Sequence, residues 1–155
     1  MDQNDIERFV EAQNKSYEGY ATALAEMSVG CKCEHWIWYV FPSMRPDKKF
    51  GSPTTQFYGI SDYAEALRYL HHPVLGPRLA EITAVVHLHL IEKKDKEVTR
   101  LMSNINDIKK LRSCMKLFMR VGADADASTL PWLTTFLAHA DAIFHLIDKP
   151  EYQHR

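Results

Sequence analysis

Residues 35–42 hold the side chains best suited to chemistry in this chain. The segment starts at His35, contains Trp36 and Trp38, and ends at Pro42. Because residues 36–41 are apolar on every side, the segment belongs in a core, an interface or the wall of a pocket. The imidazole and the two indole N–H groups still need hydrogen-bond partners there. A pocket wall would place His35, a candidate proton-transfer group, beside flat aromatic rings.

Two thiols precede this segment in the pattern Cys31-Lys32-Cys33-Glu34-His35. Thiolate and imidazole groups are ligands that zinc prefers, but a structural zinc site needs four of them. The usual second pair is missing, because His87 and His89 would point about 200° apart on a helix. The pattern therefore predicts two ordinary thiols, with no metal site and no cofactor.

A second polar group comprises Asp107, Lys110, Arg112 and Ser113, on a segment that also carries an apolar stripe. One interpretation is an anion-binding face made by Lys110, Arg112 and Ser113. The other is an ion pair within the helix, because Asp107 and Lys110 are one turn apart. The sequence leaves both open.

A third polar group, His71-His72-Pro73 with the nearby Arg78, lies between two predicted helices, where side chains can face a cleft. The simpler interpretation is a histidine that caps the backbone carbonyls at the end of a helix, and we favour it. A role for these residues in a ligand site is the alternative.

Composition and missing motifs exclude several classes of protein. The formal net charge is −1, so no overall field attracts nucleic acid or acidic lipid. No glycine-rich phosphate loop and no Gly-x-Ser-x-Gly motif occurs. The longest apolar run, residues 36–41, is too short to span a bilayer, and an odd number of cysteines suits a reducing compartment. We expect a soluble, cytoplasmic protein without nucleic-acid or membrane partners; its oligomeric state stays open.

Hydrophobic periodicity predicts the elements that must position these groups. Apolar residues recur at helical spacing from Ile6 to Met27, after a capping box of Asn4 and Glu7, and Gly30 ends the helix. Residues 35–41 have no readable period, so a buried helix and a buried strand both remain open, with helix favoured. Residues 44–55 are predicted to be a loop.

The rest of the chain shows helical patterns separated by short breaks. Asp62 or Ser61 caps the next helix, which ends at the residues before Pro73, and Pro77 lies in the first turn of another. Residues 93–96 form a charged turn, and a short helix, a longer one over 108–121 and a last helix after Pro131 follow. The pattern predicts a mainly α fold, one compact multi-helix domain over residues 1–155, with a short strand or extended segment near 35–42 as the alternative.

Several blocks of the sequence resemble the family called domain of unknown function 1810. The blocks are Asp5-Ile6-x-Arg8-Phe9-Val10-x-Ala12-Gln13, Gly30-x-Lys32-x-x-His35 with the segment to Pro42, Ser52-Pro53-Thr54-x-x-x-Tyr58-x-Ile60, Glu65-Ala66-x-x-Tyr69-Leu70-x-His72-Pro73 with its continuation to Leu79, and Asp107-x-x-Lys110-Leu111-Arg112-Ser113-Cys114-Met115-x-Leu117-Phe118. The resemblance implies a compact, mostly helical domain and no established reaction. Members are sometimes labelled calpastatins, a label that does not suit a packed aromatic core, because calpastatin repeats are flexible.

The polar residues inside these blocks are not needed for an apolar core, so we expect them to converge on a cleft walled by Trp36 and Trp38. They are His35, Ser52, Tyr58, His72, Arg78, Asp107, Lys110, Arg112 and Ser113. Aromatic walls suit a nucleobase-like ring, and cations suit a phosphate or carboxylate.

We therefore expect a nucleotide-like or ADP-ribose-like ligand, with hydrolysis of an N-glycosidic bond as the concrete reaction. His35, Asp107 and Lys110 are the catalytic candidates, and Glu65 is a second candidate for general acid or base. The chain is similar in overall character to the NADAR group, but no catalytic residue is carried over. The alternative is a non-enzymatic protein-interaction module whose contact is residues 36–41 or the basic loop 45–49.

Overall fold

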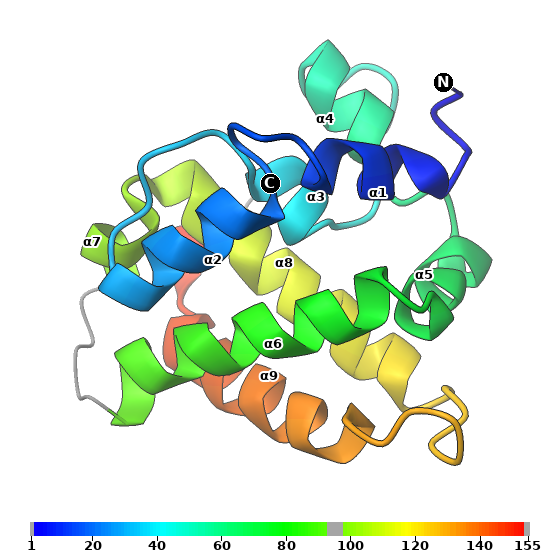
Figure 1. Cartoon of the computed structure of the whole chain (residues 1–155). Helices are drawn as coiled ribbons and strands as arrows, with labels where there is room; N and C mark the ends of the chain where they lie inside the picture. The colour runs from blue at the N-terminus through cyan, green and yellow to red at the C-terminus, as the bar shows by residue number, and fades with distance from the viewer. Residues whose placement is uncertain (1, 93–97, 154–155) are drawn as a thin grey trace.

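The computed structural model describes residues 2–92 and 98–153, and in this part of the chain the fold is all-helical (Figure 1). No β-sheet forms among these residues. One isolated parallel bridge joins Met44 to Ile60, with Arg45 N–H donating to the Ile60 carbonyl at 2.8 Å. The mainly α prediction is therefore confirmed.

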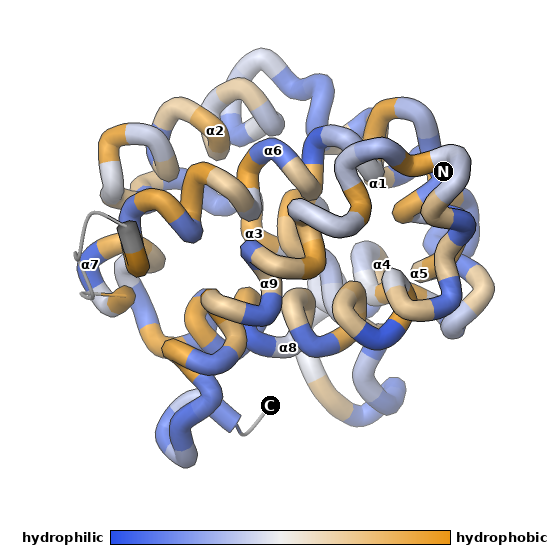
Figure 2. Tube along the Cα trace, turned by 90° about the horizontal axis from the view of Figure 1, so that it is seen from below, coloured by the Kyte–Doolittle hydropathy of each residue, from blue (hydrophilic) through white to orange (hydrophobic). Residues whose placement is uncertain are grey.

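Three long helices, α6 (Leu75–His87), α8 (Ile105–Gly122) and α9 (Leu133–Ile147), form the centre of the core. α9 packs against both α6 and α8, and Figure 1 shows α6 and α9 side by side. The buried side chains are those that periodicity predicts, among them Leu79, Leu111, Phe118 and Phe136. The hydrophobic and hydrophilic stretches alternate along the helices, as Figure 2 shows.

The predicted first helix is two helices, α1 (Glu7–Gln13) and α2 (Tyr20–Val29), so the prediction of one continuous helix is wrong. Glu18, with φ of 60°, reverses the chain between them. Tyr17, which the stripe would bury, is 64% exposed. The capping box does not form either, because Asp5 Oδ1, and not Asn4, accepts the Glu7 N–H at 2.9 Å.

The aromatic segment is a single buried turn of helix, α3 (Ile37–Val40), which decides between the two alternatives. One more helix, α4 (Pro53–Tyr58), begins inside the loop predicted over residues 44–55. Ser52 caps α4 by accepting the Thr55 N–H at 3.1 Å, and Pro53 occupies the first turn, where its missing N–H costs nothing. The loop prediction missed this short helix because six residues are too few to show a period.

The remaining helices are α5 (Tyr63–His71), capped by Asp62 as predicted, α7 (Val98–Met102), the π-helical turn η1 (Leu88–Glu92) and the 3-10 turn η2 (Pro150–Tyr152). The charged turn predicted over residues 93–96 lies outside the described residues. Among the described helices none is by itself long and apolar enough to cross a membrane. α5 and the helical run after it would meet that test only as a pair bent by 83°.

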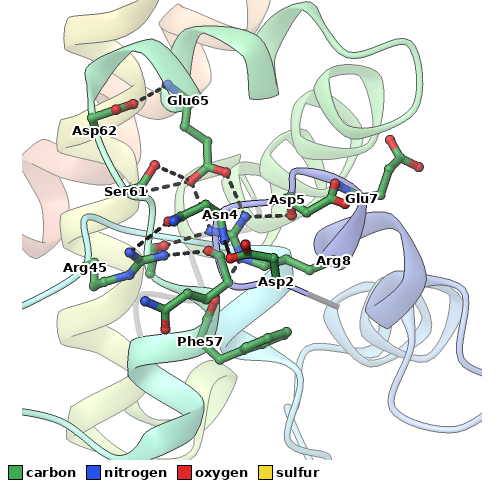
Figure 3. Close-up of polar contacts among 12 residues, drawn as sticks. Asp2, Asn4, Asp5, Glu7, Arg8, Arg45, Phe57, Ser61, Asp62 and Glu65 are labelled. Carbon is green, nitrogen blue, oxygen red and sulfur yellow. Dashed lines mark hydrogen bonds and ion pairs between the residues drawn. The ribbon is translucent and has the colours of Figure 1, made fainter.

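A buried ion pair joins the N-terminal region to α5 (Figure 3). The Arg8 guanidinium donates to both carboxylate oxygens of Glu65, at 2.7 and 3.0 Å, and to the carbonyls of Asp5, Phe57 and Gly59. Both side chains are 0% exposed. All five guanidinium N–H groups are therefore used inside the protein. Glu65 is thus a structural residue, which corrects its interpretation as a candidate general acid or base.

Candidate functional site

A polar cleft of about 380 Å³ lies between α3, the start of α4 and the first turns of α8. Its volume falls within the range of ordinary ligand sites. Five of the predicted site residues line it: His35, Trp38, Ser52, Asp107 and Lys110. The other lining residues are Lys32, Ile37, Thr55, Asn104 and Asn106.

The floor of the cleft contains a second buried ion pair, between Lys32 Nζ and Asp107 Oδ2 at 2.8 Å. The Lys32 side chain is 4% exposed and that of Asp107 is 10% exposed. The ammonium group also donates to the Glu34 carbonyl at 2.5 Å and lies 4.9 Å from the centre of the Trp36 ring. These contacts compensate the burial of the positive charge, while the carboxylate reaches the cleft.

Backbone contacts fix Lys32 in this place. Gly30 ends α2 in the left-handed conformation, with φ of 90°, which a residue without a side chain adopts without strain. The Lys32 N–H then donates to the Leu101 carbonyl at 2.8 Å, and the Ser103 hydroxyl donates to the Lys32 carbonyl. These bonds anchor the segment after α2 to α7 and to Ser103, just before α8 begins.

Glu26 holds the chain between Lys32 and α3. Its Oε1 accepts hydrogen bonds from the Cys33 N–H at 2.8 Å, the Glu34 N–H at 3.1 Å and the Trp36 indole N–H at 2.8 Å. Partial burial opposes ionisation of this carboxyl group, but the three donors outweigh it and hold the pKa of Glu26 below its usual range. Glu26 thus orders the residues that precede the aromatic wall.

Asp107 lies in the first turn of α8. Asn104 caps this helix, and its side chain accepts the Asp107 N–H at 2.9 Å. The positive end of the helix dipole favours an anionic side chain at this position. Asp107 forms an ion pair with Lys32 from the segment after α2, a partner that the sequence interpretation did not include.

The aromatic wall of the cleft is Trp38, which is half-buried. Trp36 is fully buried and its indole N–H is bonded to Glu26, so it supports the floor and does not face the cleft. His35 is exposed at the rim.

Two more hollows adjoin the cleft along α8. A narrow one of about 20 Å³ is lined in part by Tyr58, Trp38 and Lys110. A wider groove of about 680 Å³ is lined in part by Arg112 and Ser113. The eight predicted residues on this side of the molecule are thus spread over three adjoining hollows.

His72 and Arg78 lie elsewhere. His72 Nδ1 accepts the Val74 N–H at 3.1 Å near the start of α6, and its Nε2 is 2.9 Å from Glu7. His72 therefore accepts from backbone N–H groups, whereas His71, whose Nδ1 lies 3.0 Å from the Leu67 carbonyl, contacts a helix carbonyl as the simpler interpretation of the sequence expected. Arg78 contacts the side-chain oxygen of Asn14 at 3.1 Å and supports the turn between α1 and α2. The structure does not bring either residue, or Trp36, to the cleft.

Sequence reasoning missed Lys32, Thr55, Asn104 and Asn106 as lining residues. The one signal for Lys32 was its place in the shared pattern Gly30-x-Lys32-x-x-His35. Among the described residues no group of three or more histidine, cysteine, aspartate or glutamate side chains could hold a metal ion. The chemistry that the cleft offers is a carboxylate, ammonium groups, hydroxyl and amide groups, and one aromatic face.

Comparisons with known proteins identify relatives without a described activity. A family model described as "Protein of unknown function (DUF1810)" matches residues 3–141. No curated protein matches the chain. The crystal structure of the conserved hypothetical protein Rv1873 from Mycobacterium tuberculosis is similar, with 34% sequence identity and a TM-score of 0.67 over 88% of this chain and 87% of that chain.

Proposed function

The chain belongs to the DUF1810 family of proteins of unknown function, and from the cleft we propose that it binds a nucleotide-like small molecule. The observation that carries the proposal is the Lys32–Asp107 pair on the floor of a 380 Å³ cleft beside Trp38 and Lys110. Trp38 offers a face for a flat ring, and Lys110 offers a charge for an anionic group. Asn104, Asn106 and Ser52 add donors and acceptors for sugar hydroxyl groups.

Hydrolysis of an N-glycosidic bond is the reaction that we propose for this ligand. Asp107 takes a proton from a water molecule, whose oxygen bonds to the anomeric carbon of the sugar while the carbon–nitrogen bond breaks. The departing nitrogen takes a proton from protonated His35 at the rim. The ion pair with Lys32 holds the Asp107 carboxylate in place at the cleft. A cytoplasmic location, where nucleotides are abundant and the exposed thiols of Cys31 and Cys33 stay reduced, belongs to the same proposal.

A thermal-shift screen with adenosine, ADP, NAD and ADP-ribose tests the binding. At a ligand concentration of roughly 100 times Kd we expect the melting temperature to rise by about 5 to 10 °C. Trp38→Ala and Lys110→Gln should reduce the rise, and Lys109→Gln, a matched charge change outside the cleft lining, should not. A panel that leaves the melting temperature unchanged would sink the proposal.

Chromatography of the incubated ligands tests the reaction. We expect release of the free base by the wild-type protein, and loss of that release in Asp107→Asn with the thermal shift retained. If a ligand binds and no base is released, the hydrolase proposal is wrong and only the binding proposal stands.

The exposed loop after α3 favours a second candidate, a non-enzymatic protein-interaction module. Phe50 is 64% exposed and Met44 is 45% exposed, next to the basic loop 45–49. Residues 36–41 cannot supply the contact, because all of them except Trp38 are buried. Two results together would favour this candidate. No ligand of the panel raises the melting temperature, and size-exclusion chromatography shows a defined complex with another protein that Phe50→Ser disrupts.

A further inference from the structure

The groove beside the cleft concentrates positive charge. Four basic side chains, Arg45, Arg112, Lys116 and Arg120, line it together with one acidic side chain, Asp47. The whole chain has a net charge of −1, so this clustering is local and does not follow from the composition.

Helical spacing explains the arrangement on one side of the groove. Arg112, Lys116 and Arg120 recur at every fourth position of α8 and so share one face of the helix. Arg112 is partly neutralised by Asp148, whose Oδ1 lies 2.9 Å from its Nε. On the opposite side, Arg45 donates to neutral oxygens only: the carbonyls of Gln3 and Gln56 and the side chain of Asn4.

The groove and the cleft lie on either side of the narrow hollow of about 20 Å³. This hollow shares Trp38, Thr55 and Lys110 with the cleft, and Ser43 and Met44 with the groove. Met44 is 45% exposed, and its unbranched thioether can change conformation at this boundary. A ligand bound in the cleft can therefore extend one part toward the groove.

We propose that the groove is a phosphate subsite for the ligand whose ring and sugar occupy the cleft, so that the ligand class is a nucleoside carrying a phosphate chain. The inference rests on the proposed function. Arginine and lysine side chains bind phosphate oxygens through charge-assisted hydrogen bonds, and Ser113 adds a hydroxyl donor.

Isothermal titration with adenosine and ADP at low and high ionic strength tests the inference. We expect ADP to bind about tenfold more tightly than adenosine for each charge-assisted hydrogen bond gained. High salt should weaken the binding of ADP and leave adenosine unchanged. Lys116→Gln and Arg120→Gln should each lower the affinity for ADP by about three- to tenfold. Lys109→Gln, the same charge change on the same helix outside the lining, should leave both affinities unchanged.

The outcomes separate the two proposals. Equal affinities for adenosine and ADP, unaffected by Lys116→Gln, would overturn the phosphate subsite and leave the cleft proposal standing. Failure of both ligands to bind would overturn the cleft proposal and the subsite with it. Competition of ADP by polyglutamate at lower concentration than by pyrophosphate would also overturn the subsite, because the groove would then prefer an acidic peptide.

Discussion

Two buried ion pairs in the described part of the chain, Arg8–Glu65 and Lys32–Asp107, have opposite surroundings. Arg8 and Glu65 are 0% exposed, and every guanidinium N–H meets an oxygen of the protein (Figure 3). Lys32 and Asp107 are 4% and 10% exposed, and they form the floor of a cleft. The first pair has no group left to offer a ligand, whereas the second presents a carboxylate to one.

This difference shows that a buried charge can either stabilise the scaffold or supply a functional group to a site. A buried charge is costly unless its partners satisfy it, so a closed network such as that of Arg8 resists any change. Burial opposes the ionisation of Glu65, but Arg8 and two hydrogen bonds from Ser61 outweigh it and keep the pKa of Glu65 below its usual range. A pair at a cleft keeps a route to water, so its carboxylate can exchange partners.

Arg8→Met should have the largest effect on stability. It leaves the Glu65 carboxylate buried without its cation, so we expect the free energy of unfolding to fall by about 3 to 5 kcal/mol in urea denaturation. The double variant Arg8→Met with Glu65→Met should recover part of this loss, because no buried charge then remains. A loss below about 1 kcal/mol in the single variant would mean that the network is not closed.

Lys32→Met should cost less, about 1 to 3 kcal/mol, because Asp107 can be hydrated from the cleft once its partner is gone. The same variant should abolish base release, because the ion pair with Lys32 positions the Asp107 carboxylate. Arg8→Met, assayed below its melting temperature, serves as the control that should keep ligand binding. If Lys32→Met and Arg8→Met lower the free energy of unfolding equally, the proposed difference between the open and the closed ion pair is wrong.

Glu26→Gln should change how stability depends on pH. Because the pKa of Glu26 is lowered in the folded state, its contribution is fully present above the ordinary glutamate pKa and is lost as the pH falls through the lowered value. We expect the variant to be less stable by about 1 kcal/mol at pH 7. Urea midpoints measured from pH 7 down to pH 3 should converge for the two proteins; a constant gap would contradict the role of the charged carboxylate.

Asp148→Asn should have the smallest effect. Its pair with Arg112 lies at the surface, where such pairs contribute below about 1 kcal/mol. The Arg112 hydrogen bond and, less strongly, the positive charge of Lys116 lower the pKa of Asp148, so the carboxylate is charged at neutral pH. Its removal should raise the affinity for ADP by about two- to threefold, because the groove then carries more uncompensated positive charge. Reduced affinity in titration calorimetry would contradict the phosphate subsite.

Local patterns were sufficient to predict much of the helical framework. The cap at Asp62, the left-handed Gly30 and the apolar stripe of α8 depend on neighbours within one or two turns, and the structure contains all three. The turn at Glu18 was not predictable, because the apolar spacing continues across it and only packing requires the chain to reverse there.

The candidate site also has features that the sequence predicted and features that it could not predict. The residue types at His35, Trp38, Ser52, Asp107 and Lys110 indicated that they were available for chemistry, and these five line one cleft. Spacing could not show that Glu65 belongs to a structural network or that Lys32 lies on the cleft floor. Each of them pairs with a residue that is remote in the sequence.

The sequence by itself therefore determined a mainly helical chain, several of its helix ends and the polar residues that an apolar core does not need. Only the tertiary structure decided which of those polar residues meet. Helix propensity and capping act over a few residues along the chain, whereas the partner of a buried charge is decided by the packing of distant helices. Arg8 was therefore enclosed with Glu65, and Lys32 was brought to Asp107 at the edge of a cleft.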